Sequence, residues 1–129
     1  MAVPETGQET ARKLYAAAIG EGGGAPFELD TAVAENLAAA CDKLVDDLQR
    51  AMADGHLVTT VTGFPDLPTG HGLTRGFADK GKQYLDTLAA FQETALLFKA
   101  AYLAAANRFA DAEAANQAAL RLVTEYLAP

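Results

Sequence analysis

Residues 77–126 carry apolar or small side chains at alternating steps of three and four positions. The series is Phe77, Gly81, Tyr84, Leu88, Phe91, Ala95, Phe98, Tyr102, Ala105, Phe109, Ala112, Asn116, Ala119, Val123 and Tyr126. A mean period of about 3.5 residues is typical of a helix that buries one side against other helices. Because its aromatic side would otherwise face water, such a helix requires neighbours. The sequence therefore predicts a helical hairpin or bundle, completed by dimerisation or by another helix of the same chain.

The composition supports an all-α fold. Among 129 residues, alanine occurs 29 times and isoleucine once, at Ile19, so strong helix formers displace the β-branched residues that a sheet favours. The length fits a single domain over residues 1–129. The net charge of −7 disfavours nucleic acid as a partner, because phosphate backbones would be repelled.

Neither a membrane span nor a secretory leader is expected. No run of about 18 apolar residues occurs, and the first residues lack the basic and apolar regions of a signal peptide. If the protein leaves the cell, we therefore expect a signal-peptide-independent route. Cys41 is the only cysteine, so an internal disulfide is excluded and Cys41 is expected to pack in the core.

Glycine and capping residues divide the chain into segments. A short helix is expected over residues 5–19, followed by a flexible joint in the glycine run at 20–24, so that residues 1–28 form one part and residues 29–129 a hairpin. Asp30 is a suitable N-cap for a second helix that ends between Asp54 and Thr60. A third helix is expected from Leu73 to Leu127, with Gly76 and Gly81 as weak points.

The hairpin is expected to bury a seam between its two long helices. Its members are Leu37, Leu44, Leu48, Phe77, Tyr84, Leu88, Phe91, Phe98 and Tyr102. At about 1.5 Å per residue, the second helix spans roughly 40 Å and the third roughly 80 Å. The third helix should therefore extend beyond its mate after about Tyr102, leaving Phe109 and the apolar positions after it to be covered by the short first helix or by a partner, which would compete for this surface.

The sequence offers no combination of residues typical of catalysis or metal binding. His56 and His71, with Asp54 or Asp66, lack the spacing of a zinc site, and Asp42 and Asp46 lie opposite the apolar stripe, where a solvated face is expected. The glycine run lacks the lysine and Ser/Thr of a phosphate-binding loop. We therefore expect a non-enzymatic protein with no cofactor, metal or catalytic residue.

A recognition patch is expected near the start of the last quarter of the chain. Phe109 and Glu113 are one helical turn apart, so an aromatic ring and a carboxylate project from one edge of the stripe. The alternative interpretation is that Phe109 belongs to the buried stripe and that the nearby acid is fortuitous.

Residues 30–129 resemble the helical-hairpin substrates of actinobacterial type VII (ESX) secretion, the WXG-type proteins and their longer secretion-associated relatives. The resemblance is carried by a helix, a turn and a longer helix ending in Phe109-Ala110-Asp111-Ala112-Glu113-Ala114-Ala115-Asn116. That family has a secretion signal Tyr-x-x-x-Asp/Glu just after the hairpin, which Phe109 and Glu113 match with phenylalanine in place of tyrosine. The Trp-x-Gly turn of the family is absent, and Gly63-Phe64 occupy the corresponding turn.

The resemblance implies a secreted or cell-surface protein, cytoplasmic before export, that pairs with another helical hairpin as a homo- or heterodimer and contacts a component of the secretion machinery. The leading hypothesis is thus a type VII secretion-associated protein, either a WXG-like substrate or a co-secreted partner. A second hypothesis is a cytosolic adaptor, chaperone or antitoxin-like partner that holds a secreted effector soluble through the same apolar surface.

Overall fold

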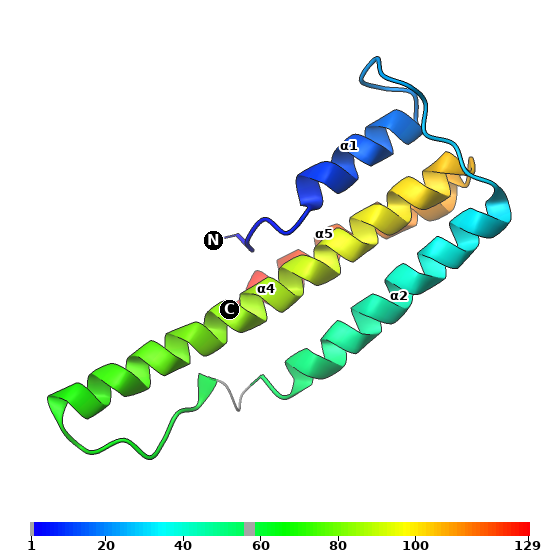
Figure 1. Cartoon of the computed structure of the whole chain (residues 1–129). Coiled ribbons are helices and arrows are strands. Elements are labelled where there is room, and N and C mark those ends of the chain that lie inside the picture. The colour runs from blue at the N-terminus through cyan, green and yellow to red at the C-terminus, as the bar shows by residue number, and fades with distance from the viewer. Residues whose placement is uncertain (1, 56–58) are drawn as a thin grey trace.

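The computed structural model describes residues 2–55 and 59–129, and the helices in these ranges all pack around one of them (Figure 1). They are α1 (Gln8–Ala18), α2 (Thr31–Ala53), α4 (Pro68–Ala105) and α5 (Phe109–Leu127). No β-strand occurs in the described ranges. Figure 1 shows α4 with α1 along one flank, α2 along the other and α5 behind it. The predicted all-α class is therefore confirmed.

The predicted antiparallel hairpin is formed by α2 and α4. The backbone N–H of Leu29 donates to the carbonyl oxygen of Ala105 at 2.9 Å, so α2 starts beside the end of α4. At the other end, a methyl group added to Gly55 would lie 2.5 Å from Cδ2 of Leu85, so the chain leaves α2 in close contact with α4. Asp30 is the N-cap residue of α2 as predicted, but its side chain makes no capping hydrogen bond.

The short helix α1 docks on the side of α4 through polar contacts and one buried alanine. Nε2 of Gln8 donates to Oε1 of Glu93 at 3.0 Å, and the hydroxyl oxygens of Thr6 and Thr94 lie 2.8 Å apart. Ala11 is fully buried in a cluster with Leu96, Leu97 and Ala119. The N-terminal helix thus covers part of α4 within the chain, which was one of the two predicted ways to complete the bundle.

The expectation of one helix from Leu73 to Leu127 is wrong. The helix starts earlier, at Pro68, runs without a break through both glycine positions and ends at Ala105. Asn107 adopts a positive φ of 61°, and its backbone N–H donates to the carbonyl oxygen of Ala104 at 2.9 Å, while that of Arg108 donates to Leu103 at 2.9 Å. This pattern is a Schellman motif, in which a left-handed residue satisfies the last carbonyls and stops the helix. Asparagine tolerates this conformation better than other non-glycine residues.

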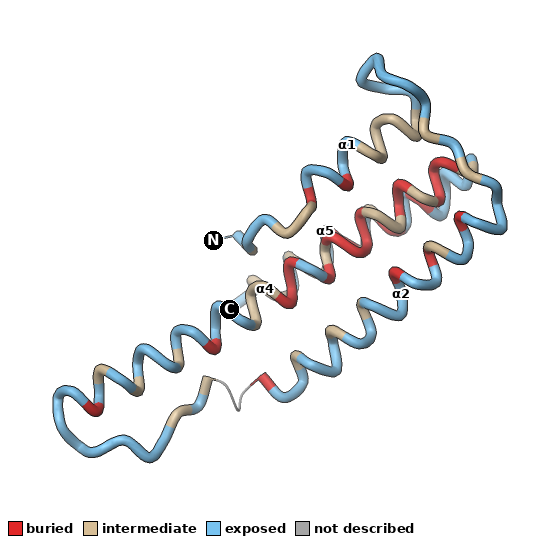
Figure 2. Tube along the Cα trace, in the orientation of Figure 1, coloured by how far each residue is buried: buried red, intermediate tan, exposed pale blue. Residues whose placement is uncertain are grey.

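Because of this turn, α5 folds back along α4 and does not project from the bundle. Ala104 and Ala112 share a buried cluster near the turn. Further along, Tyr126 donates its hydroxyl to Oδ1 of Asp86 at 2.6 Å. Burial and this carboxylate raise the pKa of Tyr126 above its ordinary range. Figure 2 shows the buried residues concentrated along the second half of α4.

The unaccompanied part of the long helix is its beginning, which contradicts the predicted C-terminal extension. α4 has 38 residues, whereas α2 has 23 and α5 has 19. Since α2 ends near Leu85 and α5 near Asp86, residues 68–84 extend beyond both helices and are accompanied, among the described residues, by the segment 59–67. We call residues 68–84 the overhang. At about 1.5 Å per residue it is about 25 Å long.

Asn107→Val is expected to lower the free energy of unfolding by about 1–2 kcal/mol, because a β-branched residue is strained at positive φ. Urea unfolding followed by circular dichroism would measure this loss. Asn107→Gly is the matched control, and it should leave stability unchanged or slightly higher, since glycine adopts this conformation freely. Equal midpoints for the two variants would contradict the assigned role of Asn107.

Candidate interaction surface

Four consecutive residues of α4 show which sides of the helix face α1 and α2. Gln92 is almost fully buried and donates to the carbonyl oxygen of Val45 in α2 at 3.1 Å. Glu93 contacts Gln8 and Arg12 of α1, and Thr94 contacts Thr6 just before it. A helix turns by about 100° per residue, so Phe91 points to the side left over between α1 and α2. Phe91 is 43% exposed. Figure 1 shows α1 and α2 flanking α4 with α5 behind it, so none of these helices crosses the near side of α4.

Aromatic side chains follow this open side of α4, and we call them the aromatic strip. Its members are Phe77, Tyr84, Phe91, Phe98 and Tyr102. The first four are spaced by seven residues, which keeps them on one face. Rings from neighbouring segments contact the two ends. Phe64 stacks on Phe77 with ring centroids 5.7 Å apart, and Phe27 meets Tyr102 edge-on at 6.4 Å.

The aromatic strip is open to solvent from Phe77 to Phe91. Phe77, Tyr84 and Phe91 are 55%, 49% and 43% exposed. Among the described residues, neither Tyr84 nor Phe91 has a ring partner. Three half-exposed aromatic rings on one face leave on the order of 300 Å² of apolar surface in water, the scale at which surface patches are often functional.

The residues predicted to be buried between α2 and α4 are therefore only partly buried. Leu88 is buried as predicted, whereas Leu37, Leu48, Phe98 and Tyr102 are half-buried, and Leu44, Phe77, Tyr84 and Phe91 are exposed. The contact between the two helices is made instead by smaller and polar side chains, including Ala38 with Leu103, and Lys99 donating to Asp42 at 2.8 Å. The exposed aromatic members of the predicted seam, Phe77, Tyr84 and Phe91, thus form an open apolar face on α4.

Cys41 lies at the edge of this contact and is buried, as predicted. Burial, together with the negative charge of Asp42, raises the pKa of its thiol above the ordinary value. A buried thiol that stays protonated at neutral pH packs as a small apolar group and is a poor nucleophile.

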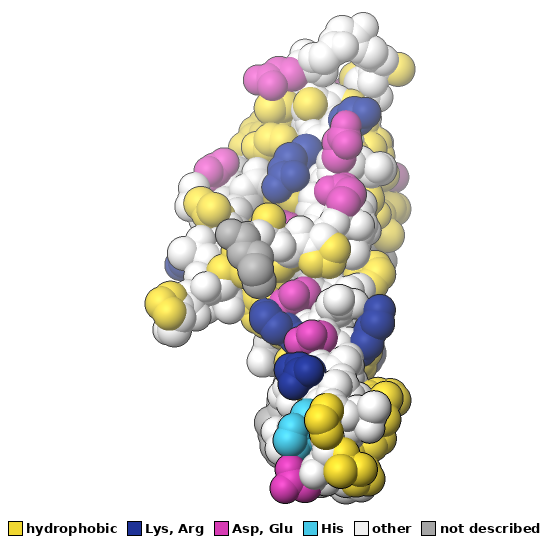
Figure 3. All heavy atoms as spheres, turned by 90° about the vertical axis from the view of Figure 1, so that its left-hand side faces the viewer, with side chains coloured by type: hydrophobic (Ala, Val, Ile, Leu, Met, Phe, Trp, Pro, Cys, Tyr) yellow, Lys and Arg dark blue, Asp and Glu magenta, His cyan; other side chains and the backbone are white. Residues whose placement is uncertain are grey.

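The free end of the overhang carries a second apolar patch, shown at the lower end of Figure 3. Its exposed members are Phe64, Leu67, Leu73 and Phe77. This patch joins the aromatic strip at Phe77. This patch was not predicted from the sequence, although Phe64, Leu67 and Leu73, among or next to the prolines and glycines of residues 63–72, were a visible signal.

Phe109 and Glu113 lie where α4 turns into α5. Phe109 is the first residue of α5 and 50% exposed. Glu113 is exposed one turn later and accepts a hydrogen bond from Nε2 of Gln117 at 3.1 Å. Arg108, just before them, pairs with Asp111 and with Glu35 of α2. The i,i+4 pair thus sits on an exposed helix start at one end of the bundle, rather than midway along a projecting helix.

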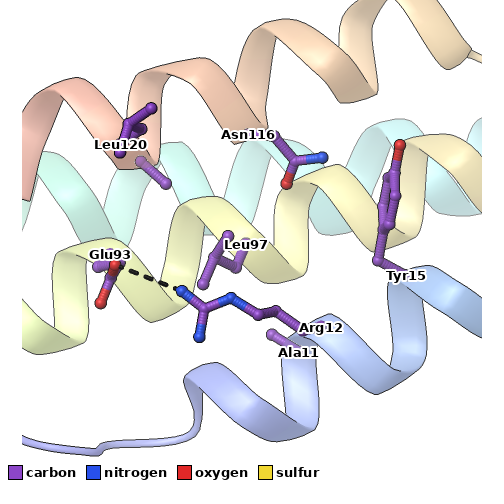
Figure 4. A pocket seen from close by; sticks show the side chains of 8 residues that line it. Ala11, Arg12, Tyr15, Glu93, Leu97, Asn116 and Leu120 are labelled. Atoms are coloured by element: carbon purple, nitrogen blue, oxygen red, sulfur yellow. Dashed lines mark ion pairs between the residues drawn. The ribbon is translucent and has the colours of Figure 1, made fainter.

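A cleft of about 320 Å³ opens between α1, α4 and α5 (Figure 4). It is lined by Ala11, Arg12, Tyr15, Glu93, Leu97, Asn116, Ala119 and Leu120. Its charged groups, Arg12 and Glu93, face each other at 3.7 Å and serve to hold α1 against α4. Tyr15 and Asn116 project into the cleft from opposite helices. This arrangement suits helix docking, because its charges are already paired with each other.

Residues considered for metal binding do not form a site within the described part of the chain. His71 is hydrogen-bonded to Asp66 at 2.7 Å on the surface, whereas His56 lies outside the described residues. No group of three or more potential ligands is found in residues 2–55 and 59–129. Over the same ranges, none of the helices has the length and apolar character needed to cross a membrane.

Comparison with known proteins identifies no relative of this chain. The chain matches no protein-family model, no curated protein and no solved structure.

Proposed function

We propose that this chain is a non-enzymatic helical protein associated with type VII secretion, a WXG-like substrate or co-secreted partner. It acts by pairing its open apolar face with another helical protein and by presenting Phe109 and Glu113 to the export machinery. The observation that carries the pairing is the aromatic strip, with three heptad-spaced rings about half in water. Helical proteins use such faces to receive a partner helix.

The export part of the proposal is supported by the placement of the signal-like pair. Phe109 follows the end of the α2–α4 hairpin by four residues, which is where the resembling family carries its signal. Both side chains are exposed and lie one turn apart on a well-formed helix, so they can enter a receptor groove together. The alternative interpretation, in which Phe109 belongs to a buried stripe, does not apply, because Phe109 is 50% exposed.

Phe109→Ala and Glu113→Ala are each expected to reduce export at least tenfold in cells that carry a type VII secretion system. The physical reason is that an exposed anchor residue contributes to binding a partner but little to folding. The measurement is the amount of protein in culture filtrate relative to cells, by immunoblot. Leu120→Ala and Glu125→Ala are matched controls, because they remove an exposed apolar and an exposed acidic side chain from the same helix.

Circular dichroism of the purified variants shows whether their fold is intact. Unchanged export of folded Phe109→Ala and Glu113→Ala would remove the signal role. If the unmodified chain stays in the cytosol while a bound partner is exported, the cytosolic adaptor or antitoxin-like function replaces this proposal.

A further inference from the structure

The chain carries two surfaces that complement each other in length and type. The overhang is about 25 Å long and presents Leu73, Phe77 and Tyr84. The open side of α4 between α1 and α2 starts at Tyr84 and is apolar and aromatic up to Phe98, about 21 Å, beyond which the ring of Phe27 lies against Tyr102. Since Tyr84 ends one surface and begins the other, a two-fold axis at Tyr84 would place the overhang of one copy on the open side of another.

The spacing of the aromatic strip is symmetric about this point. Phe77 and Phe91 each lie seven residues from Tyr84. In an antiparallel pair of α4 helices centred there, Phe77 of each copy faces Phe91 of the other, and the two Tyr84 side chains face each other. Such an isologous contact uses the same patch twice and closes without leaving a free apolar face.

Charge favours the same arrangement. Of the chain's 10 basic and 17 acidic residues, Arg75, Lys80 and Lys82 lie within residues 59–85, against Asp66 and Asp79. The whole acidic excess therefore belongs to the rest of the molecule. In the antiparallel pair, the slightly basic overhang lies against the acidic body of the other copy, whereas a parallel pair would place overhang on overhang.

We propose that the occupant of the open side is the overhang of a second copy of this chain, in an antiparallel pair centred on Tyr84. This inference rests on the pairing surface of the proposed function and names its partner. Each copy contributes the half-exposed rings together with Leu44 and Leu73. With their polar surroundings, the two copies bury about 1,000 Å² or more in total, the lower limit for a specific interface.

Disulfide cross-linking tests the register. In a Cys41→Ala background, Tyr84→Cys is expected to form a covalent dimer under mild oxidation, because both thiols lie at the two-fold axis within disulfide reach. Phe77→Cys and Phe91→Cys should each cross-link at least tenfold less alone, yet cross-link efficiently when mixed. Non-reducing gels give the yields, and circular dichroism confirms that each variant is folded.

Monomeric Tyr84→Cys protein, or equal cross-linking of Phe77→Cys alone and in the mixture, would overturn the antiparallel register. Light scattering of the unmodified chain at micromolar concentration gives an independent result, with twice the chain mass expected. If the unmodified chain is a monomer and Phe91→Glu still abolishes binding to a cellular partner and export, self-pairing is rejected and the proposed function stands.

Discussion

Ala104→Leu is expected to lower the free energy of unfolding by about 2–3 kcal/mol and to loosen α5 from α4. Ala104 is fully buried in a cluster with Ala38, Leu103 and Ala112, where small side chains let the helices approach closely. Inserting three carbon atoms into a close-packed contact forces side chains off their rotamers or moves the backbone. The expected loss is a large part of the net stability of a domain of this size.

Urea unfolding gives the stability change, and amide hydrogen exchange shows where the structure opens. Protection should fall in α5 and in the end of α1, because Ala112 of α5 and Tyr15, Ala18 and Ile19 of α1 pack against the cluster that contains Ala104. Ala114→Leu is the matched control: it adds the same atoms to the exposed side of α5 and should change stability by less than about 0.5 kcal/mol. If the two variants unfold alike, the alanine contact does not hold α5 in place.

The same alanines explain how much of the fold could be predicted from the sequence. The helical class, the antiparallel α2–α4 pair and a non-helical segment after the first helix follow from periodicity and glycine placement, and all are present. Alanine, however, is a strong helix former that is compatible with both core and surface positions. The fully buried residues of α4 are mostly of this type, namely Ala89, Ala90, Ala100, Ala101 and Ala104.

The large aromatic residues led to the prediction that the wrong side of α4 is buried. A stripe of Phe and Tyr identifies the most apolar face of a helix, but it does not say whether the covering element belongs to the same chain. Here α1, α2 and α5 pack mainly against the alanine-lined sides, and the aromatic face is left half open. Of the nine predicted seam residues, Leu88 is buried, four are half-buried and four are exposed.

The turn between α4 and α5 could not be predicted from the apolar pattern, because the spacing of the apolar residues continues unchanged across the turn. Tyr102, Ala105 and Phe109 follow the same steps of three and four that a continuous helix would show. A short turn changes the direction of the chain without changing this spacing. The local signal was Asn107 alone, since asparagine is a frequent left-handed residue after a helix end, and a single asparagine is also common within helices.

Phe91→Glu is expected to weaken self-association at least a hundredfold. In a two-fold interface the substitution occurs twice, and each carboxylate would have to leave water to face an aromatic ring of the other copy. The side chain is 43% exposed in the single chain, so it can turn to solvent in the monomer at little cost. The dissociation constant from sedimentation equilibrium should therefore rise while the urea midpoint of the dissociated monomer stays nearly unchanged.

Leu120→Glu is the control for added surface charge. Leu120 is 62% exposed on α5, away from the aromatic strip, so this variant should associate like the unmodified chain. Loss of association in both variants would indicate a general effect of net charge, which is already −7.

A second substitution distinguishes the proposed register from any other use of the same face. In the antiparallel pair, position 91 of one copy faces position 77 of the other, so Phe77→Lys combined with Phe91→Glu places opposite charges across the interface twice. The self-association of this double variant should be at least tenfold tighter than that of Phe91→Glu alone. Added salt should weaken it, because partly exposed ion pairs are screened by salt. Tyr84→Lys combined with Phe91→Glu should recover nothing, since that lysine lies seven residues from the glutamate of the other copy. Equal recovery by both pairs would mean that the aromatic strip binds without a fixed register.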